Sequence, residues 1–178
     1  MKKVYCLSFS LFFLSTICFA EISKKEKKAL IDLHESTNGN QWIHKWDLKA
    51  PVADWYGVTV ENDRVIGLNL FRNNLMGPLS HKLGDLEHLQ VLNLAFNSIT
   101  GELPQEISAL TELQVLKLEM NRLNGALPTG IGALSKLVEL SVFNNFLTGE
   151  IPESVGKLTT LKILNLSSNA FYGAIPNS

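Results

Sequence analysis

The residues of this chain with the most scope for chemistry are large apolar and charged side chains that recur in columns 24 residues apart. One column contains Phe71, Ala95, Glu119, Phe143 and Ser167, and the next contains Arg72, Phe96, Met120, Asn144 and Ser168. A third column, two residues before the first, contains Asn69, Asn93, Lys117, Ser141 and Asn165. Covered aromatic rings bury about 150–250 Å² each, and exposed apolar patches of a few hundred Å² often mark interaction sites. This chemistry is that of recognition.

Catalysis and metal binding find little support in the residue pattern. The four histidines are His34, His44, His81 and His88, and they form no paired-histidine metal motif. No metalloprotease motif, nucleophile elbow or phosphate-binding glycine loop occurs. Both cysteines, Cys6 and Cys18, lie near the amino terminus, so the rest of the chain has no thiol chemistry. We therefore expect no enzymatic activity, no bound metal and no cofactor.

An internal repeat of 24 residues explains why these columns exist. Asparagine recurs at Asn73, Asn97, Asn121, Asn145 and Asn169. Leucine recurs at Leu68, Leu92, Leu116, Leu140 and Leu164, and a second apolar residue follows each of them by two. Leu-x-Leu directs two side chains to one face of a short strand, and the asparagine follows where the chain turns. A buried asparagine can bond to backbone groups of the turn, so stacked copies should form a structural ladder.

A second apolar set follows at helical spacing in each unit, as in Ile107, Leu110 and Leu113. One unit cannot bury both sets alone, but stacked units can. Each fully buried aliphatic side chain contributes about 1.5–3 kcal/mol, so the core needs no disulfide. We predict an α/β solenoid, a right-handed superhelix with a concave parallel β-sheet and a convex side of short helical or 3-10 turns. It should comprise residues 65–178 in five units, the last one incomplete.

These units resemble leucine-rich repeats of the 24-residue class, LxxLxLxxNxLxGxIPxxLGxL, which is familiar from plant receptor ectodomains and secreted inhibitors. The stretch from Leu113 to Leu134 carries the match, with Leu116, Asn121 and Pro128 at the key places. The resemblance is highly specific for the fold but poorly specific for the ligand. It implies either inhibition of an extracellular enzyme or service as the sensing part of a receptor complex.

Residues 21–64 precede the repeats and are predicted to form a helical and hairpin cap. Ser23 and Glu26 form a capping box that opens a helix, and Gly39 is its expected stop. Two short apolar runs flank Glu61–Arg64 and predict a hairpin that leads into the first repeat. The aromatic residues before this hairpin are expected to cover the end of the solenoid, with a sugar-stacking platform as the alternative.

The cap also resembles the amino-terminal cap of the same family, in Ala29-Leu30 and in Trp-Tyr-Gly-Val at residues 55–58. Family members from plants usually carry cysteines around this motif, where the present chain has Ala53 and Val60. This departure indicates a bacterial member.

Residues 1–20 are typical of a removable export signal. Lys2 and Lys3 precede an apolar stretch that is too short to span a bilayer comfortably. Cleavage would leave 14 basic and 17 acidic residues, a net charge of −3, which argues against a nucleic-acid partner. We expect a secreted or cell-envelope protein with no transmembrane segment. Lipid anchoring at Cys18 is disfavoured because Ile17 is not the small residue that such signals usually have.

We expect a non-enzymatic module that binds a protein or peptide of unknown identity on its concave face. The expected anchors are Phe71, Phe96, Met120 and Phe143, and the expected polar contacts are Arg72, Asn93, Lys117 and Glu119. A preformed sheet loses little entropy on binding. One alternative is that the rings only stiffen the sheet. Another is a structural or adhesive envelope component that self-associates through its C-terminal end, where no cap sequence follows Pro176.

Overall fold

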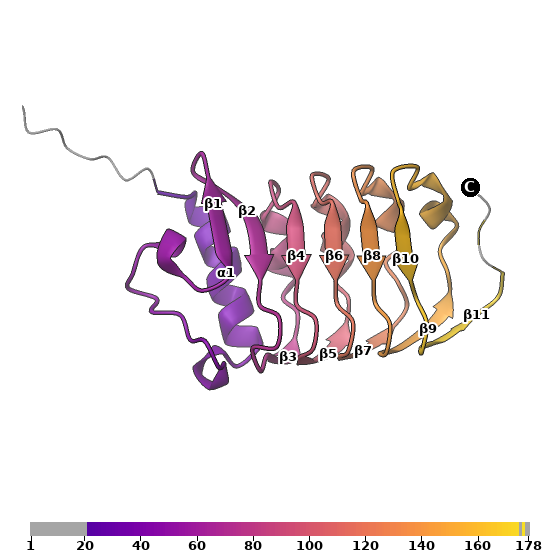
Figure 1. Ribbon diagram of the computed structural model, residues 1–178, viewed down its shortest axis with the longest axis horizontal. Helices are drawn as coiled ribbons and strands as arrows, with labels where there is room; N and C mark the ends of the chain where they lie inside the picture. The colour runs from indigo at the N-terminus through magenta and orange to yellow at the C-terminus, as the bar shows by residue number, and fades with distance from the viewer. Residues whose placement is uncertain (1–20, 175, 177–178) are drawn as a thin grey trace, which may run out of the picture.

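The computed structural model in Figure 1 describes residues 21–174 and residue 176. The expected export signal, residues 1–20, lies outside the described residues. Helix α1 (Lys24–Ser36) lies at the amino-terminal end, and successive coils of the chain follow along the long axis. This arrangement confirms the predicted α/β solenoid.

The first sheet runs along one side of the solenoid in the order β1-β2-β4-β6-β8-β10. Its strands are β1 (Val58–Glu61), β2 (Arg64–Asn69), β4 (Val91–Asn93), β6 (Val115–Lys117), β8 (Glu139–Ser141) and β10 (Ile163–Asn165). β1 is antiparallel to β2, as the predicted hairpin requires, and the other neighbours are parallel. Leu68 pairs with Leu92 and Leu92 with Leu116, so equivalent residues of successive repeats form rows across the sheet.

A second sheet lies on another side of the coils and was not predicted. Its strands are β3 (Met76–Pro78), β5 (Ser98–Glu102), β7 (Arg122–Gly125), β9 (Phe146–Glu150) and β11 (Ala170–Tyr172), and neighbouring strands are parallel. Each strand follows a repeat asparagine and includes or adjoins the repeat glycine, which has φ of 75° at Gly125. This left-handed backbone is open to glycine at little cost, so the strands can turn toward the next segment of the coil.

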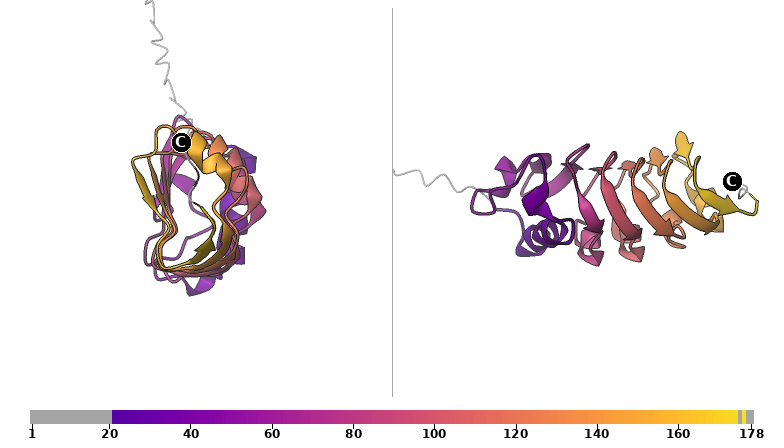
Figure 2. Two further views of the ribbon diagram at one scale, coloured as in Figure 1. Left: turned by 90° about the vertical axis from the view of Figure 1, so that its right-hand side faces the viewer. Right: turned by 90° about the horizontal axis from the view of Figure 1, so that it is seen from below.

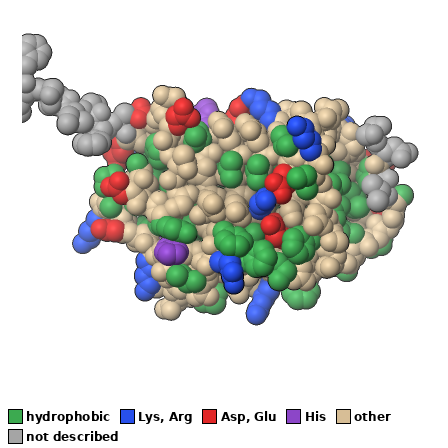
Figure 3. All heavy atoms as spheres, in the orientation of Figure 1, with side chains coloured by type: hydrophobic (Ala, Val, Ile, Leu, Met, Phe, Trp, Pro, Cys, Tyr) green, Lys and Arg blue, Asp and Glu red, His purple; other side chains and the backbone are tan. Residues whose placement is uncertain are grey.

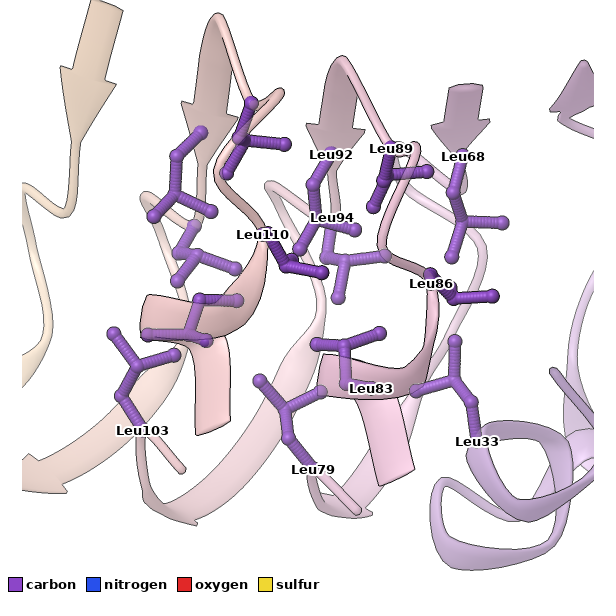
Figure 4. Close-up of a cluster of buried hydrophobic side chains, with 14 of the residues drawn as sticks. Leu33, Leu68, Leu79, Leu83, Leu86, Leu89, Leu92, Leu94, Leu103 and Leu110 are labelled. Carbon is purple, nitrogen blue, oxygen red and sulfur yellow. The ribbon is translucent and has the colours of Figure 1, made fainter. Parts of the chain in front are cut away.

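Short 3-10 helices form a third side of the coils, which confirms the expected convex turns. They are η3 (His81–Asp85), η4 (Gln105–Ala109), η5 (Ile131–Ala133) and η6 (Glu153–Lys157). Figure 2 shows the coils stacked one behind another, with the sheets and the helical segments on different sides. Leucines from α1, the strands and the 3-10 segments point into one shared interior (Figure 4), and most of them are completely buried.

The repeat asparagines from Asn97 onward join their own coil to the preceding coil through hydrogen bonds. Asn121 Nδ2 donates to Leu94 O and to Leu118 O, both at 3.0 Å. Asn121 Oδ1 accepts from the Ile99 N–H at 3.0 Å. Equivalent bonds recur at Asn97, Asn145 and Asn169. The side chain therefore satisfies backbone groups that lie inside the turn and cannot reach water.

Helix α1 begins as predicted and ends earlier than predicted. Ser23 Oγ accepts from the Glu26 N–H at 3.2 Å, and the Glu26 carboxylate accepts from the Ser23 N–H at 3.2 Å, which completes the capping box. The helix ends at Ser36, and Asn38 adopts the left-handed conformation at φ of 58°. The expectation that Gly39 stops the helix is therefore wrong, because asparagine also tolerates this conformation.

Gly39 instead leaves room for the ring of His34, since a Cβ added there would lie 2.0 Å from His34 Cδ2. The His34 ring packs edge-on against Trp42, with ring centroids 5.2 Å apart. It also stacks on Trp46 at 6.1 Å, and Trp46 stacks on Trp55 at 4.7 Å. Burial lowers the pKa of His34 below its ordinary value of 6.5, although the Glu35 carboxylate partly opposes this shift.

We predict that His34 makes the fold less stable in mild acid. The buried imidazole stays neutral while the unfolded chain binds a proton below about pH 6.5, so the free energy of unfolding falls as pH decreases through that value. Thermal melting of the chain and of His34→Phe at about pH 7.5 and about pH 5.5 measures this effect. The parent chain should lose more stability on acidification than the variant. An equal loss in both would contradict the prediction.

Candidate functional site

The candidate site is the outer surface of the first sheet, which we call the concave face. Phe71 and Phe96 are 41% and 40% exposed, and their ring centroids lie 5.2 Å apart in an edge-to-face arrangement. Arg72 Cζ lies 6.0 Å from the centroid of the Phe71 ring and 5.9 Å from that of Phe96. Two rings and a cation thus form one exposed cluster, the aromatic–arginine patch (Phe71, Arg72 and Phe96), just beyond the ends of β2 and β4.

The apolar surface extends from this patch into the cap, which the sequence analysis did not predict. Tyr56 is exposed and stacks on His44, with ring centroids 4.0 Å apart. The His44 N–H donates to Asn73 Oδ1 at 2.6 Å, and the Asn69 N–H donates to Gly57 O at 2.7 Å. These bonds hold the Tyr56–His44 pair against the first coil.

In the other direction the apolar surface continues through Met120 and Phe143, which are both half-buried. Figure 3 shows hydrophobic side chains gathered in a band across the lower part of the face that Figure 1 presents. The structure thus places the four expected anchors along one face, but Phe71 and Phe96 present more of their surface to solvent than Phe143 does.

Backbone geometry fixes how the side chains at the ends of the strands project. Five equivalent residues adopt the left-handed conformation, namely Arg72, Phe96, Met120, Asn144 and Ser168, with φ between 50° and 58°. Side chains other than glycine and asparagine rarely adopt it, because Cβ approaches the following carbonyl oxygen. A periodic count of side chains carries no information on φ, so the sequence did not reveal this conformation.

Three of the polar side chains expected to contact a ligand are paired or covered within the chain itself. Lys117 forms an ion pair with Glu139, with Nζ and Oε1 2.9 Å apart. Asn93 Oδ1 accepts from the Ala95 N–H at 3.2 Å. Glu119 is only 9% exposed, so little of this expected polar contact faces the solvent.

Among residues 21–174 and 176, no group of three or more histidine, cysteine or acidic side chains is placed to hold a metal. No helix in this part of the chain is long and apolar enough to cross a membrane. An apolar hollow of about 430 Å³ lies at the carboxyl-terminal end, lined by Leu164, Leu166, Phe171 and their neighbours. It lies against β10, which is the last strand of the first sheet.

Comparison with known proteins agrees with this geometry. Residues 64–175 match the family described as "Leucine-rich repeat region". The chain belongs to the leucine-rich repeat family. This leucine-rich repeat protein is 30% identical over 92 residues to polygalacturonase inhibitor 1 of Arabidopsis thaliana. The matched stretch is 49% of this chain and 28% of the inhibitor, so the chain spans only a part of that relative's length.

Two solved structures from Arabidopsis thaliana are similar over most of the chain. A chain of the BIR3–SERK2 complex has a TM-score of 0.72 and 30% identity, covering 83% of this chain and 84% of that one. The ectodomain of the receptor kinase GASSHO1/SCHENGEN3, in complex with CASPARIAN STRIP INTEGRITY FACTOR 2, has a TM-score of 0.76 and 33% identity. That match covers 85% of this chain and 18% of the receptor.

We predict that glycine at position 168 stabilises the repeat. Ser168 is exposed and has φ of 53°, and glycine removes the strain of this conformation at a smaller entropic cost. Ser168→Gly should raise the free energy of unfolding by about 0.5–1 kcal/mol in a urea titration. Ser135→Gly is the control, because Ser135 is an exposed turn residue without positive φ and should lose stability. Equal losses in both variants would refute the prediction.

Proposed function

We propose that this chain is a secreted, non-enzymatic leucine-rich repeat module that binds a protein or peptide on its concave face. The observation that carries the proposal is the aromatic–arginine patch, where two phenylalanine rings remain about two-fifths exposed beside a cation. Such a patch in a folded chain is typical of an interaction surface. Aromatic residues and arginine are also the side chains that most often dominate binding energy.

Rigid presentation is the proposed mechanism. Backbone bonds between coils, such as Arg72 N–H to Ala95 O at 3.1 Å and Phe96 N–H to Glu119 O at 2.9 Å, hold the patch before any ligand arrives. The ligand then finds its contacts already oriented, so less entropy is lost on binding. A row of parallel strands about 4.8 Å apart suits an extended peptide or one face of a small protein.

The solved ectodomain with its bound CASPARIAN STRIP INTEGRITY FACTOR 2 supports this type of partner, and polygalacturonase inhibitor 1 supports an inhibitor-like role as well. We further infer that the chain is of the 24-residue plant-type class, because equivalent strand residues pair at that offset. Its cysteine-free cap favours a bacterial source, and residues 1–20 favour export and release over lipid anchoring at Cys18.

A second candidate function is structural or adhesive self-association through the carboxyl-terminal end. Ile163 and Leu164 on β10 are 51% and 39% exposed, whereas the equivalent Leu140 is buried. The hollow beside them adds further apolar surface. Copies that meet at this end would cover these side chains.

Affinity capture from envelope and medium extracts tests the first proposal. The baits are the parent chain, Phe71→Ser/Phe96→Ser, and Phe146→Ser as a matched control, because Phe146 is 64% exposed on the second sheet. We expect one partner that the parent and the Phe146 control retain and that the double variant binds at least about tenfold more weakly. Thermal melting checks that all baits are folded.

Equal capture by all three baits would refute binding through the concave face. Recovery of copies of the chain alone, lost in Ile163→Lys, would instead support self-association.

A further inference from the structure

Glu119 lies within the apolar surface of the concave face and has an unusual environment. The residue is 9% exposed, and Oε2 is sealed from solvent with no hydrogen-bond partner among the described residues. The Phe96 N–H donates to Glu119 O, and the Met120 N–H donates to Phe143 O at 3.0 Å. Glu119 therefore occupies the row between Ala95 and Phe143, in the middle of the proposed binding surface.

A buried carboxylate with a structural role has a different environment in this same chain. Glu26 is also buried, but its carboxylate accepts from Ser23 Oγ at 2.7 Å, from the Ser23 N–H and from the Val65 N–H at 3.0 Å. The carboxylate with a structural role thus receives its hydrogen bonds from the chain itself. Glu119 lacks these bonds, although a buried charge without partners is unfavourable.

Neither of the expected cationic contacts of the concave face forms an ion pair with Glu119. Lys117, the last residue of β6 and two residues before Glu119, pairs with Glu139 at 2.9 Å. Arg72 lies about 6 Å from the rings of Phe71 and Phe96 and forms no ion pair within the described part of the chain. The Glu119 carboxyl group thus has no ion-pair partner within the described part of the chain and is left for a group that comes from outside it.

We propose that Glu119 is the subsite for a cationic side chain, lysine or arginine, of the peptide or protein that binds the concave face. The aromatic surface around it favours this class of group, because phenylalanine rings attract a cation while they exclude water. A guanidinium or ammonium group is also the donor that pairs best with a carboxylate. This inference rests on the proposed function and names the chemistry that the surface selects.

Selection from a displayed library of random dodecapeptides tests the proposal. The targets are the full chain, its Glu119→Gln variant and the Phe71→Ser/Phe96→Ser variant. We expect peptides selected by the parent to combine apolar residues with arginine or lysine at one fixed position. Glu119→Gln should select the apolar residues without the basic one. Glu119→Met serves as a second variant of similar size if the glutamine variant does not fold.

A resynthesised peptide then measures the pairing directly. Replacing its selected basic residue by citrulline should weaken binding to the parent about tenfold or more and should change binding to Glu119→Gln little. The melting temperature of Glu119→Gln should equal or exceed that of the parent, because the variant removes an uncompensated charge. A residue with a merely structural role would lower it.

The outcomes separate this inference from the proposed function. Apolar peptides without basic enrichment, or equal basic enrichment with the parent and Glu119→Gln, would overturn the cationic subsite and leave binding through the concave face intact. A parent chain that enriches nothing beyond the Phe71→Ser/Phe96→Ser variant would overturn both.

Discussion

The stacking of the coils in this molecule depends on the hydrogen bonds that a repeat asparagine makes with the coil before it. The turn after each strand of the first sheet leaves backbone groups inside the solenoid, where water cannot reach them. Asn121 satisfies three of these groups at 3.0 Å, and two of them belong to the preceding coil. These bonds set the offset between coils, and the offset aligns equivalent residues into rows. The concave face is therefore a consequence of a buried polar contact.

The sequence was sufficient to predict the elements that a local pattern encodes. Leucine spacing predicted the strands of the first sheet and their shared interior, and Ser23 with Glu26 predicted the start of α1. The second sheet was missed because its strands lack the Leu-x-Leu pattern and contain or adjoin the repeat glycine, a residue that is depleted in strands. The end of α1 was misplaced by the assumption that glycine stops a helix, whereas Asn38 adopts the left-handed conformation here.

The candidate site was predictable in outline, because the period alone places Phe71, Phe96, Met120 and Phe143 on one side of the coils. The solvent-exposed fraction of each side chain was not predictable, because it depends on the contacts that the side chain makes with neighbouring coils. Glu119 is mostly covered within its row, and Lys117 is paired with Glu139 from the next strand. Tyr56 and His44 join the surface only through bonds between the cap and the first coil. The Lys117–Glu139 pair and the position of Tyr56 and His44 both depend on contacts between residues that are distant in the chain.

Urea unfolding of Asn121→Ala tests most directly whether the asparagine contact holds the coils together. The substitution leaves the Ile99 N–H without its partner and removes one of the two asparagine donors from Leu94 O and from Leu118 O. A buried donor without a partner costs about 1–3 kcal/mol. Asn124→Ala is the matched control, because Asn124 is exposed and lies on β7. We expect Asn121→Ala to lose at least about 2 kcal/mol of unfolding free energy and the control to change by less than about 0.5 kcal/mol. Similar small losses in both variants would contradict the account.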